Sequence, residues 1–259
     1  MSIATDAVIP PKIAIVTGGS RGIGRSTVES LARRGVRTIF TYHTHGTDAE
    51  AVVAAAKDAG AEAIAVQLDA GNIASLGAFV ENVKDALAKL GATRFDFLVN
   101  NAGNSHRNMP FETATEEELD RIYNVHFKGV FFLTQTLLPL INDGGRIVNV
   151  STARTRMIGP GGSVYASMKG AVEVLSKHMA KELGPRRIAV NVVAPGATET
   201  DFSGGIVRDN PAVNKRVAEG TALGRAGIPE DVGRMIASLL SEDNRWINAE
   251  RIEVTGGYV

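Results

Sequence analysis

Tyr165 and Lys169 form the residue pair in this chain best suited to moving a proton. Residues four positions apart share one face of a helix. A free tyrosine has a pKa of about 10, which is too high for proton exchange at neutral pH. A neighbouring ammonium group stabilises the phenolate and lowers that pKa. We therefore expect Tyr165 to donate a proton to a carbonyl oxygen or to accept one from an alcohol.

A glycine-rich turn, Thr17-Gly18-Gly19-Ser20-Arg21-Gly22-Ile23-Gly24, precedes a predicted helix. Glycines at such a turn allow a pyrophosphate to approach the backbone, and the helix N-terminus attracts its charge. The spacing from Gly19 to Gly24 also fits a phosphate-binding loop of the P-loop type, but arginine stands where that loop needs lysine. The turn therefore favours dinucleotide binding over a P-loop phosphotransferase.

The polar residues after the second predicted strand indicate which dinucleotide binds. In NAD-binding folds an acidic residue at this strand end holds the ribose 2′-hydroxyl. Here the strand ends Thr41-Tyr42-His43-Thr44-His45, without an acid, and Arg21 lies in the neighbouring glycine-rich turn. A guanidinium in place of a carboxylate suits a 2′-phosphate, so NADP(H) is favoured over NAD(H). His43 and His45 either assist, form a small metal site, or belong to an exposed loop. Asp69, after the third strand, either shelters the adenosine or caps a helix.

Alternating apolar runs and helical periods determine the expected fold. The strands read as buried on both faces, which is typical of a parallel sheet covered by helices. We expect one doubly wound Rossmann-type domain over residues 12–259, after an N-terminal extension at 1–11. Residues 201–226 read either as a mobile substrate lid or as a fixed surface helix. The expected strands are 12–17, 36–41, 63–68, 95–99, 146–150, 188–193 and 251–254, and the expected helices are 23–34, 48–59, 73–90, 116–141, 163–183 and 229–240.

Three motifs in register, Thr17-Gly18-x-x-x-Gly22-x-Gly24, Asn100-Asn101-Ala102-Gly103 and Tyr165-x-x-x-Lys169, resemble the short-chain dehydrogenase/reductase family in its single-domain form. Bacterial 3-oxoacyl-carrier-protein reductases and related carbonyl reductases look most similar. The resemblance implies NADPH-dependent reduction of a ketone or aldehyde in a seven-stranded fold. It implies that Tyr165 is the acid/base, that Lys169 lowers its pKa and grips the nicotinamide ribose, and that Asn124 holds a relay water. Cofactor contacts are implied for Gly18, Ser20, Arg21, Gly22, Ile23, Gly24, His43, Thr44, Asp69, Asn101, Ala102, Gly103, Pro195, Gly196, Thr198 and Thr200.

One position departs from the family pattern. Where the family has a serine that binds the substrate carbonyl, this chain has Thr152, preceded by Ser151. Adjacent strand residues point to opposite faces, so only one of the two serves, and we expect Thr152.

The sequence gives fewer indications of which residues contact the substrate. Its candidate residues are His106, Arg107, Arg154, Thr155, Arg156 and Phe202. Arg154 and Arg156 either favour an anionic or carrier-bound substrate or point to water and acidic partners. His126 and His178 are expected to be packing or surface residues.

The composition narrows the function further. The 259 residues carry 28 basic and 28 acidic side chains and no cysteine, which gives no cationic field for nucleic acid and no thiolate chemistry. No metal cluster, signal peptide or membrane-spanning run is expected, so the chain reads as soluble and cytoplasmic. The resemblance implies a homotetramer acting on a small carbonyl compound or acyl thioester. Reduction of an imine and dinucleotide sensing without catalysis remain alternatives.

Overall fold

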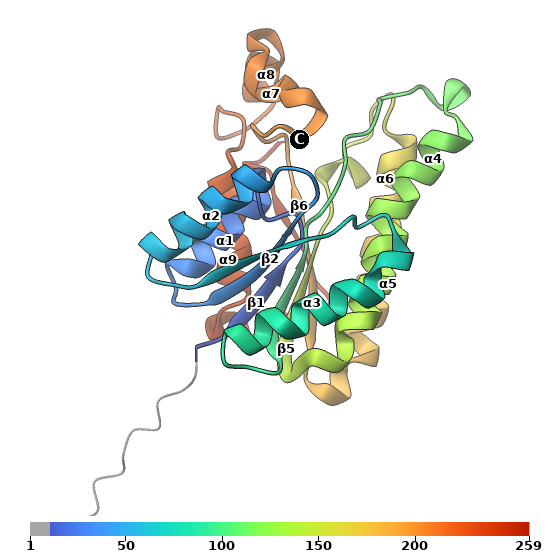
Figure 1. Ribbon diagram of the computed structural model, residues 1–259. Coiled ribbons are helices and arrows are strands. Elements are labelled where there is room, and N and C mark those ends of the chain that lie inside the picture. The colour runs from blue at the N-terminus through green and yellow to red at the C-terminus, as the bar shows by residue number, and fades with distance from the viewer. Residues whose placement is uncertain (1–10, 259) are drawn as a thin grey trace, which may run out of the picture.

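Seven parallel strands form one sheet in the computed structural model, which describes residues 11–258 (Figure 1). The strand order is β3-β2-β1-β4-β5-β6-β7, so the direction of winding reverses between β1 and β4, where such sheets bind ligands. The expected extension at 1–11 lies outside the described residues except for Pro11. The strands are β1 (Ile13–Val16), β2 (Arg37–Tyr42), β3 (Ala63–Gln67), β4 (Phe95–Asn100), β5 (Ile141–Val150), β6 (Ala189–Pro195) and β7 (Arg251–Val254).

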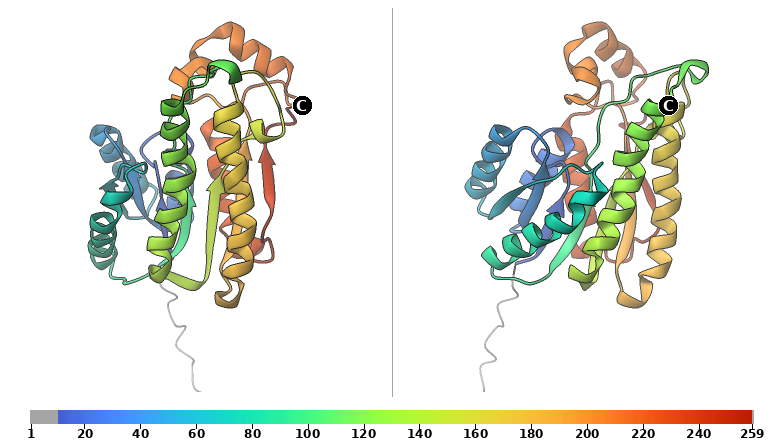
Figure 2. Two further views of the ribbon diagram at one scale, coloured as in Figure 1. Left: turned by 90° about the vertical axis from the view of Figure 1, so that its right-hand side faces the viewer. Right: turned by 45° about the vertical axis from the view of Figure 1, so that its right-hand side comes forward.

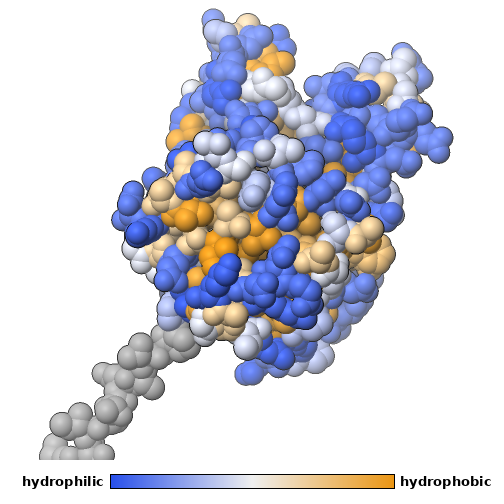
Figure 3. Space-filling model, viewed as in Figure 1, coloured by the Kyte–Doolittle hydropathy of each residue, from blue (hydrophilic) through white to orange (hydrophobic). Residues whose placement is uncertain are grey.

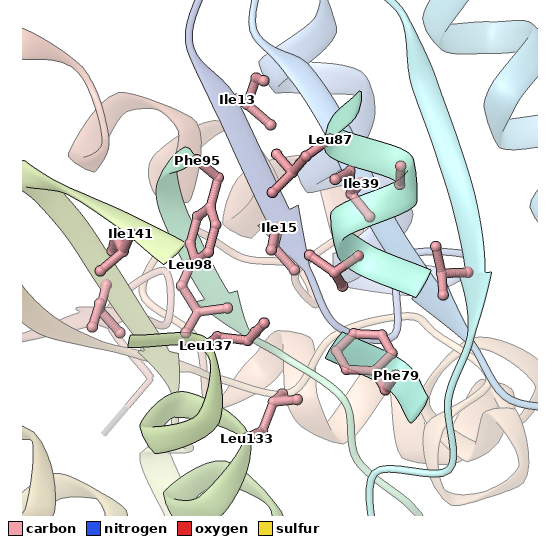
Figure 4. Packing of buried hydrophobic residues seen from close by; sticks show 14 of the residues in the cluster. Ile13, Ile15, Ile39, Phe79, Leu87, Phe95, Leu98, Leu133, Leu137 and Ile141 are labelled. Atoms are coloured by element: carbon pink, nitrogen blue, oxygen red, sulfur yellow. The ribbon is translucent and has the colours of Figure 1, made fainter. Parts of the chain in front are cut away.

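Alternate residues of each strand pack against helices on opposite faces of the sheet, as the strand repeat of two requires. Ile13 and Ile15 of β1 join one apolar core, with helices α3, α5 and α6 (Figure 4). Ala14 and Val16 join the other core, with α1, α2 and α9. The long helices are α1 (Gly22–Ala32), α2 (Gly46–Asp58), α3 (Leu76–Lys89), α4 (Glu116–Tyr123), α5 (Gly129–Leu137), α6 (Ser163–Glu182) and α9 (Pro229–Leu239).

The helix expected over 116–141 is interrupted. A π-helical segment, η3 (Asn124–Lys128), separates α4 from α5, and the 3₁₀ turn η4 (Leu138–Leu140) contains Pro139 and ends the run. Residue 141 already belongs to β5, where the expectation placed the strand start at 146. The spacing of apolar residues does not reveal a single residue inserted into a helix, so the π-helical segment could not be predicted from it. The end of the helix follows from Pro139, because proline lacks the N–H that would continue the helical hydrogen bonds. The α4–η3–α5 run still lies beside α6 along one face of the molecule (Figure 2).

Residues 201–226 fold into short helices that project above the carboxyl ends of the strands (Figure 1). Asn210 caps the largest of these helices, because its side chain accepts hydrogen bonds from the N–H groups of Ala212 and Val213. The segment is therefore partly helical, and both interpretations of it, a mobile lid and a fixed surface helix, stay predictions. Its helices are η7 (Phe202–Gly205), α7 (Ile206–Asp209) and α8 (Pro211–Glu219), and the other short turns are η1 (Ile73–Ser75), η2 (Phe111–Thr113), η5 (Ala153–Thr155), η6 (Gly184–Arg186) and η8 (Glu242–Asn244).

None of the helices within the described residues is both long and apolar enough to cross a membrane.

Candidate active site

A cleft of about 1230 Å³ opens above the carboxyl ends of the strands. The upper end of the molecule is notched between two projections, one bearing α7 and α8 and the other the segment that leads into α4 (Figures 1 and 3). The turns after β1 to β6 all contribute to the cleft lining. Every residue expected to bind the cofactor lines this cleft, and so do Tyr165, Lys169, Thr152 and Ser151.

The glycine-rich turn is packed too tightly for side chains. A Cβ atom on Gly24 would lie 2.1 Å from the carbonyl oxygen of Gly18, and Gly18 itself has a φ of +65°. Helix α1 begins directly after this turn, and its N-cap residue, Arg21, makes no side-chain cap. The first N–H groups of α1 therefore remain available for an anion, and this geometry fits a dinucleotide pyrophosphate.

Asn101 holds the glycine-rich turn from the neighbouring strand. Its side-chain amide donates hydrogen bonds to the carbonyl oxygens of Thr17, at 2.9 Å, and Gly18, at 3.1 Å. The Thr17 hydroxyl in turn accepts bonds from the backbone N–H groups of Asn101 and Ala102. The side chain of Asn101 thus shapes the cleft wall and has its donors already engaged.

Arg21 reaches two carboxylates at the outer end of the cleft. Its guanidinium lies 3.3 Å from Asp201 and 3.8 Å from Asp48, and all three side chains are partly exposed. Sequence reasoning missed both partners, because Asp201 is 180 residues away along the chain and Asp48 lies in the first turn of α2 rather than at the end of β2.

The histidines after β2 make only local contacts. The His43 imidazole lies 4.0 Å from the carboxylate of Asp69, and a 2.9 Å hydrogen bond joins Thr44 to His45. Asp69 also accepts a bond from the N–H of Gly71, so it caps a turn and lines the cleft at once. Within residues 11–258, no three or more His, Cys, Asp or Glu side chains are grouped to hold a metal ion.

Tyr165 and Lys169 lie at the base of the cleft on the first turns of α6. Only 7% of Tyr165 and 4% of Lys169 is exposed, and the ammonium lies 5.9 Å from the phenol ring centre. Lys169 donates a 2.7 Å hydrogen bond to the carbonyl oxygen of Val150, which fixes its side chain.

Burial shifts the pKa values of Tyr165 and Lys169 in opposite directions. It raises the pKa of Tyr165 to about 12, against smaller lowering effects of the Thr152 hydroxyl and the Arg154 charge. It lowers the pKa of Lys169 to about 8. Desolvation of the phenolate therefore outweighs the effects that lower the pKa of Tyr165. The lowering of this pKa by the Lys169 ammonium stays a prediction.

Thr152 and Ser151 point to different partners, as adjacent strand positions require. The Thr152 hydroxyl is close enough to the Tyr165 phenol to lower the pKa of that phenol. The hydroxyl of Ser151 instead donates a 2.6 Å bond to Glu173, which also accepts a bond from Thr155. Of the two candidates, Thr152 is the one whose hydroxyl lies beside Tyr165.

The role expected for Asn124, holding a relay water, stays a prediction. Asn124 is absent from the cleft lining, whereas Val125 and His126 are present in it. The π-helical turn of η3 changes which residues of this helix face the cleft. His126, expected to be a packing or surface residue, is 1% exposed and packs edge-on against the Tyr165 ring at 5.1 Å.

Aromatic rings enclose Tyr165 on the substrate side. The His106 imidazole stacks on the phenol at 4.7 Å, and Phe202 lies 5.8 Å from it. Burial and the Arg154 charge lower the pKa of His106, so its ring is less readily protonated than a free imidazole. The outer lining includes apolar residues that no sequence signal marked, namely Met157, Ile158, Ile206 and Val207.

The basic residues expected near the substrate separate into two groups. The Arg154 guanidinium donates hydrogen bonds to the side-chain oxygen of Asn108, at 3.1 Å, and to the carbonyl oxygen of Pro160, at 3.2 Å. It therefore links the loops that contain these two residues. Arg156 pairs with Glu253 at 3.0 Å, although it also contributes to the lining. Arg107 pairs with Glu118 and, like Thr155, is absent from the lining.

Known proteins resemble this chain over most of its length. A family model described as Enoyl-(Acyl carrier protein) reductase matches residues 18–259. The hydroxynaphthalene reductase-like protein Arp2 of Metarhizium brunneum is 33% identical over 96% of this chain and 95% of its own. The crystal structure of the angucycline C-6 ketoreductase LanV with bound NADP is 37% identical, with a TM-score of 0.89 over 95% of each chain. The promiscuous reductase LugOII, which catalyses a keto-reduction in lugdunomycin biosynthesis, is 36% identical, with a TM-score of 0.91 over 97% of this chain and 99% of its own.

Proposed function

The chain belongs to the short-chain dehydrogenase/reductase family of NAD(P)-dependent oxidoreductases, and we propose that it uses NADPH to reduce a ketone on a polycyclic aromatic compound. The observation that carries this proposal is the burial of Tyr165 at the base of the cleft, where Thr152 and Lys169 also line the cleft and the Lys169 ammonium lies 5.9 Å from the phenol ring centre. The names of the hydroxynaphthalene reductase-like and angucycline relatives support the substrate class. The aromatic surroundings of Tyr165 and the apolar outer lining support it independently.

The residues at the base of the cleft have different roles in carbonyl reduction. When bound, the dinucleotide supplies the hydride that the carbonyl carbon receives. The hydroxyls of Thr152 and Tyr165 together hold the carbonyl oxygen. The raised pKa of Tyr165 keeps its proton in place at neutral pH until the oxygen becomes basic enough to take it. Lys169 then stabilises the phenolate, and in a buried site its charge acts through little screening solvent.

NADPH is the proposed cofactor because Arg21 lies where the adenosine ribose is expected. No acidic residue follows β2 directly to hold a 2′-hydroxyl. The ion pairs of Arg21 with Asp201 and Asp48 are partly exposed and therefore weak. A 2′-phosphate would replace these carboxylates as the partner of the Arg21 guanidinium.

The proposal is tested by following NADPH oxidation with a panel of carbonyl compounds. The panel contains a hydroxylated polycyclic ketone, a simple aliphatic ketone, a 3-oxoacyl thioester, an enoyl thioester and a cyclic imine. We expect the polycyclic ketone to give the highest kcat/KM. A preference for either thioester would replace the proposed substrate class with a carrier-bound acyl chain, and a preference for the imine would replace the carbonyl reaction.

The same assay tests the cofactor. Arg21→Ala is expected to raise the Kd for NADPH by about 10- to 100-fold, the value of one or two charge-assisted hydrogen bonds, and to leave the Kd for NADH unchanged. Arg25→Ala is the matched control, because Arg25 pairs with Glu29 on the outer surface of α1 and lies outside the cleft lining. Equal weakening of both cofactors by Arg21→Ala would contradict the assignment of Arg21 to the 2′-phosphate.

A further inference from the structure

His126 is a buried histidine beside the proposed acid/base residue, and the reaction described above leaves it without a role. It lies in the π-helical segment η3 and lines the cleft with 1% of its surface exposed. Its ring meets the Tyr165 ring edge-on, and a Cβ atom on Gly103 would lie 2.7 Å from its Cε1 atom. The ring is therefore fixed in place from two sides.

The two ring nitrogens of His126 have different surroundings. Nε2 lies 2.9 Å from the backbone oxygen of Asn104 and 3.0 Å from its side-chain oxygen, while the backbone N–H of Asn104 is farther away, at 3.3 Å. Two close oxygens favour the tautomer that carries its hydrogen on Nε2. Nδ1 then presents a lone pair, and it has no hydrogen-bond partner among residues 11–258 although it is fully buried. A buried acceptor of this kind is costly unless it binds a polar group.

The charged groups around His126 are positive. The cationic groups Lys169 and Arg121 both act on the imidazole, and burial together with the Lys169 charge lowers the pKa of His126 well below its usual value. His126 is therefore neutral and keeps its lone pair. Among the described residues, Lys169 donates to Val150 alone, so two of its three N–H donors remain. An acceptor without a donor and an ammonium with free donors thus line the same cleft.

We propose that Nδ1 of His126 binds the water through which Lys169 recovers its proton, so that His126 takes the position in the relay that the family resemblance gave to Asn124. This inference rests on the proposed carbonyl reduction. A buried water needs two or more polar partners, and Nδ1 and the ammonium supply them.

This water returns to Lys169 the proton that is consumed in one turnover. Tyr165 gives its proton to the oxygen of the reduced carbonyl, and its phenolate takes one from the Lys169 ammonium. The Lys169 amine takes a proton from the water, which is replenished from solvent, so that one solvent proton is consumed for each ketone reduced. His126 orients the water and does not change its own protonation, which makes it a positioning residue.

The test compares His126→Phe, which keeps a ring but removes both nitrogens, with His126→Gln, which restores a donor and an acceptor. His126→Phe is expected to lower kcat by about 10- to 100-fold and to raise the solvent deuterium isotope effect on kcat, because proton return becomes slow. The Kd for NADPH should stay within about twofold, and His126→Gln should recover most of kcat. His178→Phe, an exposed histidine on α6, is the matched control.

Loss of kcat in His126→Phe without a rise in the solvent isotope effect would assign His126 a purely structural role. A loss confined to Asn124→Ala would return the relay to Asn124. Tyr165→Phe separates this inference from the proposed function: an active Tyr165→Phe enzyme would overturn both, whereas an inactive one with a normal His126→Phe enzyme would overturn the relay alone.

A proton inventory on the unmodified enzyme provides a second test if His126→Phe does not fold. Single-turnover rates measured across mixtures of H₂O and D₂O should follow a bowed curve, because several protons move together. A straight or flat line would contradict the relay.

Discussion

Thr152 and Ser151 show at the scale of single residues how neighbouring hydroxyls acquire different tasks. The Thr152 hydroxyl lowers the pKa of Tyr165, whereas the Ser151 hydroxyl donates a hydrogen bond to Glu173. We expect Thr152→Ala to lower kcat by about 10²- to 10³-fold, as removal of a preorganised donor to a developing oxyanion does. Thr152→Ser should retain most of kcat. Ser151→Ala should lower the melting temperature and leave kcat near that of the unmodified enzyme, and the reverse pattern would contradict the assignment.

The pH dependence of ketone reduction follows from Lys169. Its pKa of about 8 means that the ammonium is present below pH 8 and lost above it, whereas Tyr165 keeps its proton across this range because its pKa is about 12. The kcat/KM for reduction should therefore be level below pH 7 and fall as the pH rises through 8. Lys169→Arg should move this fall to higher pH, since arginine stays charged. A rate that rises through pH 8 would contradict this role of Lys169.

The position of some candidate residues in the cleft could be predicted from the sequence because local spacing defines it. Tyr165 and Lys169 share a helix face wherever a helix forms, and the glycines of the first turn need only their neighbours along the chain. His126 could not be predicted, because one extra residue in a helical turn changes which side chains face the cleft. The partners of Arg21 and the desolvation of Tyr165 depend on contacts that only the folded chain brings together.

At the scale of elements, close packing in the turn between β1 and α1 requires glycine. Gly24→Ala would place a Cβ atom 2.1 Å from the carbonyl oxygen of Gly18. We expect about 1–3 kcal/mol of destabilisation from this overpacking, together with a weaker Kd for NADPH. Gly77→Ala in α3 is the matched control, because its Cβ atom would meet nothing within 4 Å. It should be neutral or stabilising by up to about 1 kcal/mol in a denaturant titration. Similar losses in both variants would show that steric contact in the turn is not the cause.

Strand identities were predictable and some element boundaries were not. Seven strands occur in the expected chain order, because a run that is apolar on both faces fits only the interior of a covered sheet. The start of β5 at residue 141 was missed, since its first residues include the polar and flexible stretch Asn142–Gly145. Such a stretch resembles a loop, and β4 indeed pairs with Ile141 and then with Arg146, so that residues 142–145 lie in the irregularity between the two pairs.

At the scale of the whole molecule, the reversal of winding between β1 and β4 brings the separate motifs to one cleft. The glycine-rich turn, the Tyr165–Lys169 pair and residues of η7 and α7 come from three distant parts of the chain and line the same space. The formal net charge is zero, so we expect recognition of a charged cofactor to rest on local groups such as Arg21 and the α1 N-terminus rather than on the overall field.

The most direct measurement of the central claim follows a hydride into the product. NADPH carrying deuterium on either face of the nicotinamide C4 is incubated with a hydroxylated polycyclic ketone, and the alcohol is analysed by mass spectrometry. The account predicts deuterium on the carbinol carbon from one of the two labelled cofactors. It also predicts that Tyr165→Phe lowers the yield by at least about 100-fold, as loss of a general acid does, while NADPH still binds. An alcohol without deuterium from either cofactor, or a Tyr165→Phe enzyme with unchanged turnover, would contradict it.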